Sequence, residues 1–226
     1  MLTRNWHLVF GLLLTALAGY VDALGFVRLG GFYASFMSGN TTQIGVTLAH
    51  GALTPAIVPL VLIGLFLAGA TLGSALSIAA PSGWQTPVVL AAEALFVAAA
   101  LAAGLQMPDS LLTSALMAFA MGAQNAVLGA GPVKGFRAGT TFVTGALFGF
   151  GQKLAAALMR TGDPLGWVGD AIVWLALMGG ALTGAAVYQA IGIYALILPA
   201  ALAGLLALIA SLFVARRPRR IGPKAL

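Results

Sequence analysis

A run of small and polar residues interrupts an otherwise apolar chain at residues 36–45, FMSGNTTQIG. The chain is 61% hydrophobic and only 7% charged. Inside a membrane, irregular backbone is tolerated only where protein buries it or a water-filled cavity meets it. A helix that begins there presents unpaired N–H groups and the positive end of its dipole. We therefore interpret this run as the start of a short helix that faces a polar site.

Several side chains of this run can bind a small solute. Ser38, Asn40 and Thr41 offer hydroxyl or amide groups and can also cap the helix start. Gly39 allows a ligand or another backbone to approach closely. The alternative is a capped, tightly packed helix start that binds no ligand, and the sequence leaves both interpretations open.

A similar start follows later in the chain, at Thr144 and Gly145. Each short segment, residues 36–49 and 141–160, comes after a glycine-rich connector that we expect to be irregular. Two helix starts that meet near the centre of a bilayer form a polar, partly positive pocket. That arrangement is typical of secondary transporters built from repeats.

Asp22 is the first acidic candidate, because it lies near the end of the first apolar segment. An acidic residue inside a membrane is a functional hypothesis by default. Asp22 can instead act as a cap or pair with Arg28, which would give it a structural role. In the second half the corresponding position is Asn125, which stands beside Gln124. An acid in one half and amides in the other would make a directional site.

Glu93 is the only charged residue between Arg28 and Asp109. Burying an isolated carboxylate is so unfavourable that the group usually takes up a proton instead. A group that gains and loses a proton during a transport cycle can couple transport to the proton gradient, so Glu93 is the proton-coupling candidate. The alternative is a protonated structural glutamate, or one that lies in a solvated groove.

The composition indicates an integral membrane protein. A soluble domain is about one quarter charged, whereas this chain of 226 residues is 7% charged and has a mean hydropathy of +1.03. The net charge of +6 does not indicate a nucleic-acid partner, because five of the eleven basic residues lie in the last eleven positions. A basic end next to an apolar segment is typical of a cytoplasmic stop after a membrane helix. Lipid headgroup binding is the alternative.

Six segments are long and apolar enough to span a membrane, which takes about 20 residues. They are residues 8–26, 56–79, 87–105, 110–128, 168–190 and 193–214. Turn formers lie between several of them, in residues 80–87, 106–110 and 161–166. We expect the first segment to be retained as a helix, although a basic residue before an apolar run is also typical of a signal peptide.

Three pairs of short motifs recur in the same order, which predicts two internal repeats. The pairs are GYVDA at 19–23 with GAQNA at 122–126, FMSGN at 36–40 with FVTGA at 142–146, and LAGATLG at 67–73 with MGGALTG at 178–184. Their offsets are 103, 106 and 111 residues. We predict one membrane domain with these parts: 1–226 overall, repeat one at 1–105, repeat two at 106–215, and a basic cytoplasmic tail at 216–226.

Two small-residue faces predict close helix packing. Gly69 and Gly73 are one turn apart on their expected helix, as are Gly180 and Gly184. Such faces let helix backbones approach each other in a membrane, either within one chain or in a homodimer.

The two short segments decide the topology. If both span the membrane, there are eight spans and parallel halves; if both are half-helices, there are six full spans and inverted halves. Both arrangements place the termini and Arg160 in the cytoplasm, but only the second also places Lys134 and Arg137 there. The positive-inside rule therefore favours six full spans plus two shorter, polar-started helices.

No enzyme signature is present, so we expect neither enzymatic activity nor a cofactor. The sequence lacks the G-x-S-x-G, HExxH and P-loop patterns. It has no cysteine, and His7 and His50 lie far apart, so it offers no metal site.

The stretch AGYVDALGFVRLGGFYASFMSGNTTQIG resembles the YoaK-type family of bacterial inner-membrane proteins. The shared features are a Gly-x-x-Asp-Ala helix end at 19–23, a Gly-Gly break at 30–31 and a (Ser/Thr)-Gly-Asn-Thr start at 38–41. The family most often has Thr where this chain has Ser38, which keeps the hydroxyl. The resemblance covers most of the chain and implies a plasma-membrane protein of transporter-like character. It implies little mechanism, because the function of that family is itself largely unknown.

We therefore predict an all-α integral protein of the bacterial inner membrane with both termini cytoplasmic. The leading functional hypothesis is secondary transport of a small polar or anionic solute, with Glu93 or Asp22 as the group for proton coupling. The chief alternative is a non-transporting scaffold or regulatory protein. Expected partners are a small-molecule solute, the lipid bilayer and, in one interpretation, a second copy in a homodimer. The candidate solute-binding residues are Asp22, Ser38, Gly39, Asn40, Thr41, Gln124, Asn125, Thr144 and Gly145.

Overall fold

The computed structural model of the protein describes residues 2–129 and 143–216, and these residues form helices and connecting turns without a strand. The α-helices in chain order are α1 (Leu2–Leu29), α2 (Met37–Ala49), α3 (Ile57–Ala79), α4 (Gln85–Gln106), α5 (Leu112–Gly129), α6 (Val143–Leu158), α7 (Val168–Ile191) and α8 (Ile197–Ala215). Two short 3-10 helices, η1 (Thr54–Ala56) and η2 (Gly192–Leu196), lead into α3 and α8.

The helix ends lie where the sequence predicts turns. α3 ends before Ala80, whose backbone is extended ahead of Pro81. The breaks after α4 and α6 coincide with the predicted breaks at 106–110 and 161–166. α1 is longer than the predicted 8–26 and continues to Leu29. The predicted connector at 129–139, with Lys134 and Arg137, lies almost entirely outside the described residues.

Four segments of the described chain are long and apolar enough to cross a membrane: Leu8–Leu29, Thr54–Ala79, Gln85–Gln106 and Val168–Ala215. The last has 48 residues and contains both α7 and α8. Because a single span takes about 20 residues, this segment is long enough for two. These segments agree with the membrane protein that the composition predicts.

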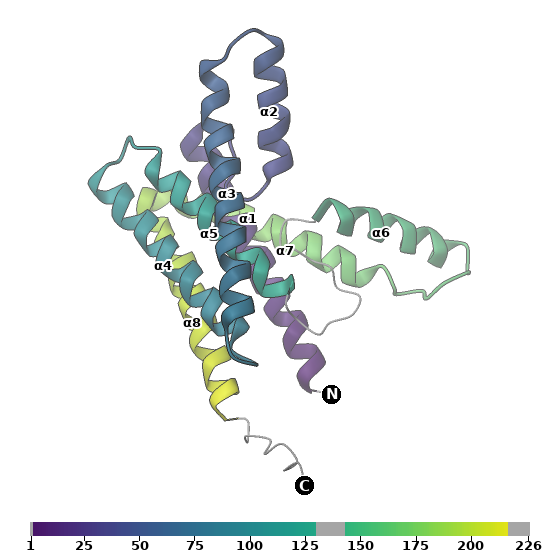
Figure 1. Ribbon diagram of the computed structural model, residues 1–226. Helices are drawn as coiled ribbons and strands as arrows, with labels where there is room; N and C mark the ends of the chain where they lie inside the picture. Colours follow the sequence, from purple (N-terminus) through teal and green to yellow (C-terminus); the bar gives the residue numbers. More distant parts are fainter. Residues whose placement is uncertain (1, 130–142, 217–226) are drawn as a thin grey trace.

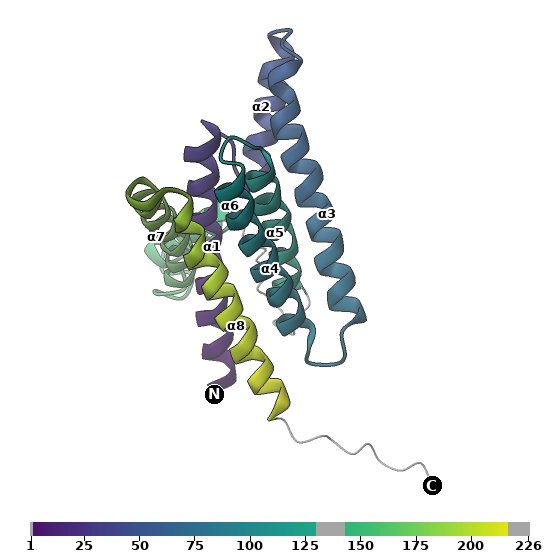
Figure 2. The ribbon, with the colours of Figure 1, turned by 90° about the vertical axis from the view of Figure 1, so that its left-hand side faces the viewer.

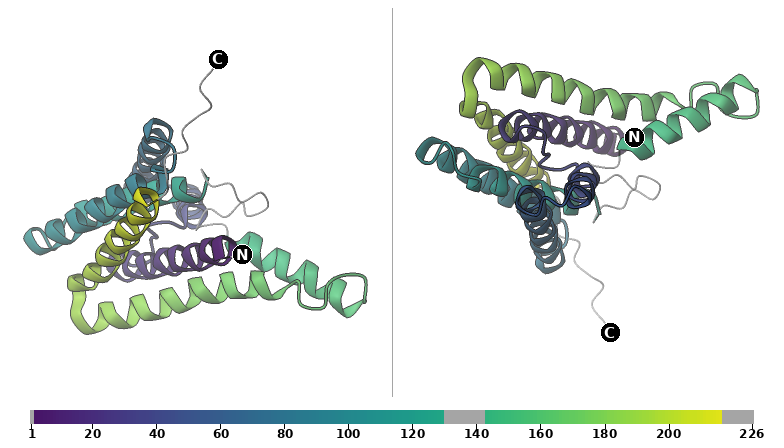
Figure 3. Two further views of the ribbon diagram at one scale, coloured as in Figure 1. Left: turned by 90° about the horizontal axis from the view of Figure 1, so that it is seen from below. Right: turned by 90° about the horizontal axis from the view of Figure 1, so that it is seen from above.

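The helices form a central bundle from which two hairpins project. α2 with the first part of α3 makes one hairpin, and α6 with the first part of α7 makes the other (Figure 1). α4 packs between α5 and α8 (Figure 2). α7 lies alongside α1 and runs in the same direction (Figure 3). α1 begins and α8 ends on the same side of the bundle.

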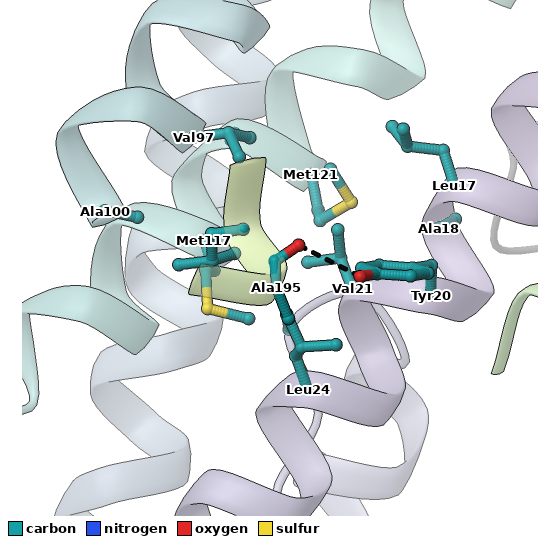
Figure 4. Close-up of a cluster of buried hydrophobic side chains, with 13 residues drawn as sticks. Leu17, Ala18, Tyr20, Val21, Leu24, Val97, Ala100, Met117, Met121 and Ala195 are labelled. Carbon is teal, nitrogen blue, oxygen red and sulfur yellow. Dashed lines mark hydrogen bonds between the residues drawn. The ribbon is translucent and has the colours of Figure 1, made fainter. Parts of the chain in front are cut away.

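The core of the bundle is a buried cluster that joins α1, α4, α5 and η2. Its members include Val21, Val97, Met117 and Met121, all less than 2% exposed (Figure 4). Tyr20 places its ring at the edge of the cluster and donates its hydroxyl to the carbonyl oxygen of Ala195 at 2.9 Å. A second cluster continues the core toward the starts of α1 and α4 and includes Phe10, Leu14, Val89, Leu90 and Leu206.

Glycines bring α7 into direct backbone contact with α1. A methyl group added at Gly180 would lie 1.9 Å from the carbonyl oxygen of Ala16, and one at Gly184 would lie 2.5 Å from that of Tyr20. No side chain fits in either space. The small-residue face predicted at these two glycines is therefore confirmed as a packing surface within the chain.

The crossing of α3 and α5 is built in the same way. A methyl group added at Gly69 would lie 2.0 Å from the carbonyl oxygen of Phe119, and one at Gly73 would lie 2.7 Å from that of Ala123. The second predicted small-residue face is thus also confirmed as packing within the chain.

Candidate functional site

Two glycines turn the chain back after α1. Gly30 has a φ of 64° and Gly31 a φ of 122°, values that residues with a side chain rarely adopt. The Gly31 N–H donates to the carbonyl of Phe26 at 3.0 Å. The following residues then run back along the last turns of α1, where a methyl group at Gly25 would lie only 3.2 Å from the nitrogen of Ala34.

Asp22 fixes this returning chain on α1. Its Oδ1 accepts hydrogen bonds from the N–H groups of Ser35 at 2.5 Å and Phe36 at 3.4 Å. Its Oδ2 accepts a hydrogen bond from the Ser35 hydroxyl at 2.6 Å. Charge-assisted bonds of this kind are stronger than neutral ones, and α2 begins directly after these residues. Asp22 therefore sets the position at which α2 begins.

Arg28 does not serve as the partner of Asp22. Its guanidinium donates instead to the main-chain carbonyls of Pro108 and Ser110, the latter at 3.3 Å. Arg28 thus ties the end of α1 to the turn between α4 and α5. Within the described residues, Asp22 has no ion pair.

Asn40 holds the returning chain from the other side. It is fully buried, and its Oδ1 accepts a hydrogen bond from the Tyr33 N–H at 3.0 Å. Its Nδ2 donates to the Tyr33 carbonyl at 2.8 Å and also contacts the Met37 sulfur at 3.5 Å. Both ends of the amide are therefore used within the protein, as a clamp on the main chain of Tyr33.

The expected capping of α2 by its own polar residues is wrong. Phe36 is the N-cap residue, and no side chain of α2 itself caps the start of the helix. The Thr41 and Thr42 hydroxyls donate to the carbonyls of Met37 and Ser38, at 2.8 and 3.0 Å. The physical reason is that a hydroxyl inside a helix reaches the carbonyl one turn earlier, whereas capping requires a position before the first turn.

Asn40→Ala is expected to lower the free energy of unfolding by about 1–3 kcal/mol, because the Tyr33 main chain loses both partners. Thermal unfolding of the purified protein in detergent measures the change. Thr41→Ala is the matched control, since it removes an exposed hydroxyl from the same helix. An equal loss of stability in the two variants would contradict the clamp.

A cavity of about 540 Å³ lies between α1 and α7, at the starts of α2 and α6. Its lining includes the polar side chains of Asp22, Ser35 and Thr144. Its small apolar residues are Gly19, Ala23, Ala181 and Ala185, and its aromatic residues are Phe26, Tyr33, Phe36 and Trp174. The cavity therefore joins residues of the first half of the sequence with residues more than 100 positions later.

Three of the aromatic rings form one continuous wall. The ring centroid of Tyr33 lies 5.2 Å from that of Phe26 and 5.1 Å from that of Phe36. Phe36 and Tyr33 also cover Gly39, where an added methyl group would lie 2.6 Å from the Phe36 ring. The lack of a side chain at Gly39 therefore leaves room for the rings of Phe36 and Tyr33, and these rings separate Gly39 from the cavity.

Residues 10–209 match a protein family described as "Protein of unknown function (DUF1275)". The chain belongs to the DUF1275 family. It is also 38% identical over 202 residues to a UPF0700 transmembrane protein of Rhizobium meliloti (strain 1021), which covers 89% of this chain and 84% of the relative. No solved structure matches the chain. The YoaK-type resemblance is compatible with this membership, and the DUF1275 protein is an integral membrane protein.

Most of the candidate residues of this DUF1275 protein do not line the cavity. Its described lining does not include Ser38, Gly39, Asn40, Thr41, Gln124, Asn125 or Gly145. Gln124 is fully buried and donates its Nε2 to the Leu14 carbonyl at 3.0 Å, while Asn125 donates its Nδ2 to the Met121 carbonyl at 2.8 Å. Asp22 and Thr144 are the two candidates that the cavity brings together.

The sequence argument missed three features of the site. Ser35 had a weak signal, because it stands just before the polar run. Tyr33 lies in the glycine-rich connector, and Phe36 is the first residue of the polar run that follows it. Trp174 had no signal, since it is one apolar residue among many on α7 and only the packing of α7 on α1 places it at the cavity.

Glu93 lies in the core of the DUF1275 fold. It is fully buried on α4, and neither carboxyl oxygen has a hydrogen-bond partner among the described residues. The Gln124 Oε1 is also buried and has no such partner in that part of the chain. Two buried polar groups therefore stand on neighbouring helices with hydrogen-bonding capacity left over.

The register of α4 and α5 puts Glu93 and Gln124 at matching levels of the two helices. The helices are antiparallel neighbours, and a methyl group at Gly104 would lie 3.2 Å from the Thr113 hydroxyl. Glu93 lies eleven residues before Gly104, and Gln124 lies eleven residues after Thr113. Because eleven residues make about three turns, both return to the face that the helices share.

Proposed function

We propose that this DUF1275 protein is a secondary transporter of the bacterial plasma membrane that binds a small polar solute in the cavity between α1 and α7. One observation carries the proposal: two helix starts border one cavity. Ser35 and Phe36 precede α2, and Val143 and Thr144 begin α6. Helices that begin at membrane depth next to a shared cavity are the usual site plan of repeat-built transporters. Neither enzymatic chemistry nor a cofactor forms part of the proposal.

The helix crossings support two internal repeats. At the glycines of the α1–α7 crossing, α1 contacts α7 through Ala16, Gly19 and Tyr20. At the α3–α5 crossing the contact positions on α5 are Phe119, Gly122 and Ala123, which are the three α1 positions shifted by 103 residues.

The other two helices of the crossings correspond in the same way. The contact positions on α3 are Phe66, Gly69, Ala70 and Gly73, and a shift of 111 residues gives those on α7, which are Leu177, Gly180, Ala181 and Gly184. These are the offsets of the corresponding sequence motifs.

The directions of the helices support inverted repeats. The proposed equivalents α1 and α5 run antiparallel, and so do α4 and α8 (Figure 1). A two-fold axis along the membrane normal would make equivalent helices parallel, whereas an axis in the membrane plane makes them antiparallel. We infer six full spans with α2 and α6 as shorter helices that begin within the membrane. Both termini then lie on the cytoplasmic side, in keeping with the basic residues at the end of the sequence.

A binding screen tests the proposal. Purified protein in detergent is screened by thermal shift against small organic acids, amines, nucleobases and inorganic ions. At least one compound is expected to raise the Tm, and Ala185→Phe and Thr144→Val are expected to abolish or weaken that shift, because both residues line the cavity. Uptake of the compound into proteoliposomes then separates transport from binding.

The neighbouring residue on α7 provides a matched control for the screen. Leu182→Phe adds a ring of the same kind to a side chain that is 71% exposed on the outer face. It is expected to keep the thermal shift of the wild type. A shift that survives Ala185→Phe but is lost in Leu182→Phe would place the solute elsewhere and remove the proposed site.

The second candidate function is a non-transporting scaffold or regulatory membrane protein. The hydrogen bonds of Asp22 and Asn40 favour it, because these two side chains hold the chain before α2. In that case the polar residues serve packing and the cavity needs no occupant. Failure of every compound in the screen, together with wild-type behaviour of Ala185→Phe in cells, would favour this function.

A further inference from the structure

We propose that the cavity binds a small organic cation, such as a protonated amine or a quaternary ammonium ion, between the Asp22 carboxylate and the aromatic wall. This inference rests on the proposed function, because it names the class of solute for the same cavity. It departs from the anionic solute that the sequence analysis offers as one option, and it assigns the solute a positive charge.

The first support is the negative charge of Asp22. All of its described hydrogen bonds are ones that it accepts, from the Ser35 N–H and hydroxyl and from the Phe36 N–H. A main-chain N–H can only donate, so the bonds from Ser35 and Phe36 favour the ionised form of Asp22. No described Lys, Arg or His forms an ion pair with it. No described cationic side chain balances the charge at the cavity, so a cationic solute can supply the partner that an intramembrane charge usually has.

The second support is the aromatic lining. Phe26, Tyr33 and Phe36 form the continuous wall beside Asp22, and Trp174 lines the cavity from α7. The faces of aromatic rings attract cations, and Trp does so most strongly. A carboxylate next to several rings is thus suited to a cation that has both charge and apolar surface. The volume of about 540 Å³ is within the usual range for small-molecule sites.

The start of α2 offers little to an anion. The N–H groups of Met37, Gly39 and Asn40 already bond to the carbonyls of Ser35 and Phe36. The positive end of the α2 dipole is met by the carboxylate of Asp22, which holds the two residues before the helix. An anionic solute in the cavity would lie near that carboxylate and be repelled by it.

Three probes of similar shape separate the effect of solute charge from that of the aromatic ring: benzylammonium is positive, benzyl alcohol neutral and benzoate negative. Their binding to the purified protein is measured at neutral pH by thermal shift and by the fluorescence of the tryptophans. Benzylammonium is expected to raise the Tm and to bind at least about tenfold more tightly than benzoate. Benzyl alcohol reports what the ring alone contributes.

Two variants assign the binding to the cavity. Asp22→Asn removes the charge and is expected to weaken benzylammonium binding at least about tenfold. Because Asp22 also holds Ser35, Trp174→Leu provides a second test that leaves those hydrogen bonds in place, and it is expected to weaken binding several-fold. Lys153→Ala is the control, since Lys153 pairs with Asp170 on the α6–α7 hairpin and does not line the cavity; it should bind as the wild type does.

The outcomes separate this inference from the proposed function. Binding of benzoate as tight as that of benzylammonium, lost in Ala185→Phe, would overturn the cationic class while the cavity remained a solute site. Benzylammonium binding that is unchanged in both Asp22→Asn and Trp174→Leu would also overturn the inference. If none of the three probes and no compound of the wider screen binds, the inference and the proposed function fail together.

Discussion

Gly180→Ala is expected to lower the free energy of unfolding by about 1–3 kcal/mol or more, which is the range for overpacking a well-packed contact. The added methyl group would lie 1.9 Å from the Ala16 carbonyl oxygen. That oxygen belongs to the backbone of α1, so it cannot turn aside as a flexible side chain would. The clash is relieved only if α7 moves away from α1, and this motion would also open the cavity between them. Thermal unfolding in detergent measures the loss.

The preceding residue on α7 is the matched control. Gly179→Ala makes the same chemical change at a position with no neighbouring atom within 4 Å of the new methyl group. It is expected to leave the stability unchanged or to raise it slightly, because alanine favours a helix over glycine. A similar loss in Gly179→Ala and Gly180→Ala would show that helix propensity, and not the crossing, determines the effect.

The crossing of α3 and α5 allows the same comparison, and its outcome bears on the proposed repeats. Gly69→Ala would place a methyl group 2.0 Å from the Phe119 carbonyl oxygen, whereas Gly64→Ala has no neighbour within 4 Å. If the two crossings are equivalent, Gly69→Ala is expected to destabilise the protein about as much as Gly180→Ala.

The sequence predicted the parts of this fold that depend on local chemistry. Glycine and proline mark the ends of α3 and α4, because these residues cannot continue a helix or do so poorly. Pairs of glycines one turn apart predicted close helix crossings, since only a residue without a side chain leaves room for a second backbone. The short helices α2 and α6 followed from their polar starts. Each of these signals lies within a few residues of the feature that it predicts.

The parts that the sequence did not show depend on how distant segments meet. Asn40 has the right chemistry to bind a solute, but the returning chain places Tyr33 against it and uses both ends of the amide. Trp174 faces the cavity only because α7 crosses α1 at Gly180. The sequence does not show which helices cross each other. It therefore predicted Asp22 and Thr144 as candidates without showing that they border one cavity.

Glu93 lies in a core that offers no positive charge to balance a carboxylate. The helices α3, α5 and α8 that pack around α4 contain no Asp, Glu, Lys, Arg or His. On α1, Asp22 is held by Ser35 and Arg28 by the α4–α5 turn. By its spacing Gln124 lies at the matching level of α5, and its Oε1, which has no described partner, can accept a hydrogen bond from a protonated carboxyl but not from a carboxylate. A proton on Glu93 would therefore allow a hydrogen bond between α4 and α5 that the carboxylate cannot make.

Glu93→Gln is expected to abolish proton-driven uptake while it leaves solute exchange intact. The carboxamide has nearly the shape of the protonated carboxyl and can donate to Gln124, so stability should change by less than about 1 kcal/mol. Because it cannot release a proton, accumulation against a gradient should fall at least about tenfold. Proteoliposomes loaded with the solute from the binding screen measure both processes: uptake driven by a pH gradient, and exchange without one.

Glu93→Asp retains an ionisable group and is expected to keep part of the accumulation. Wild-type accumulation in Glu93→Gln would exclude Glu93 as the coupling group, and equal loss of uptake and exchange would assign it a structural role in the core.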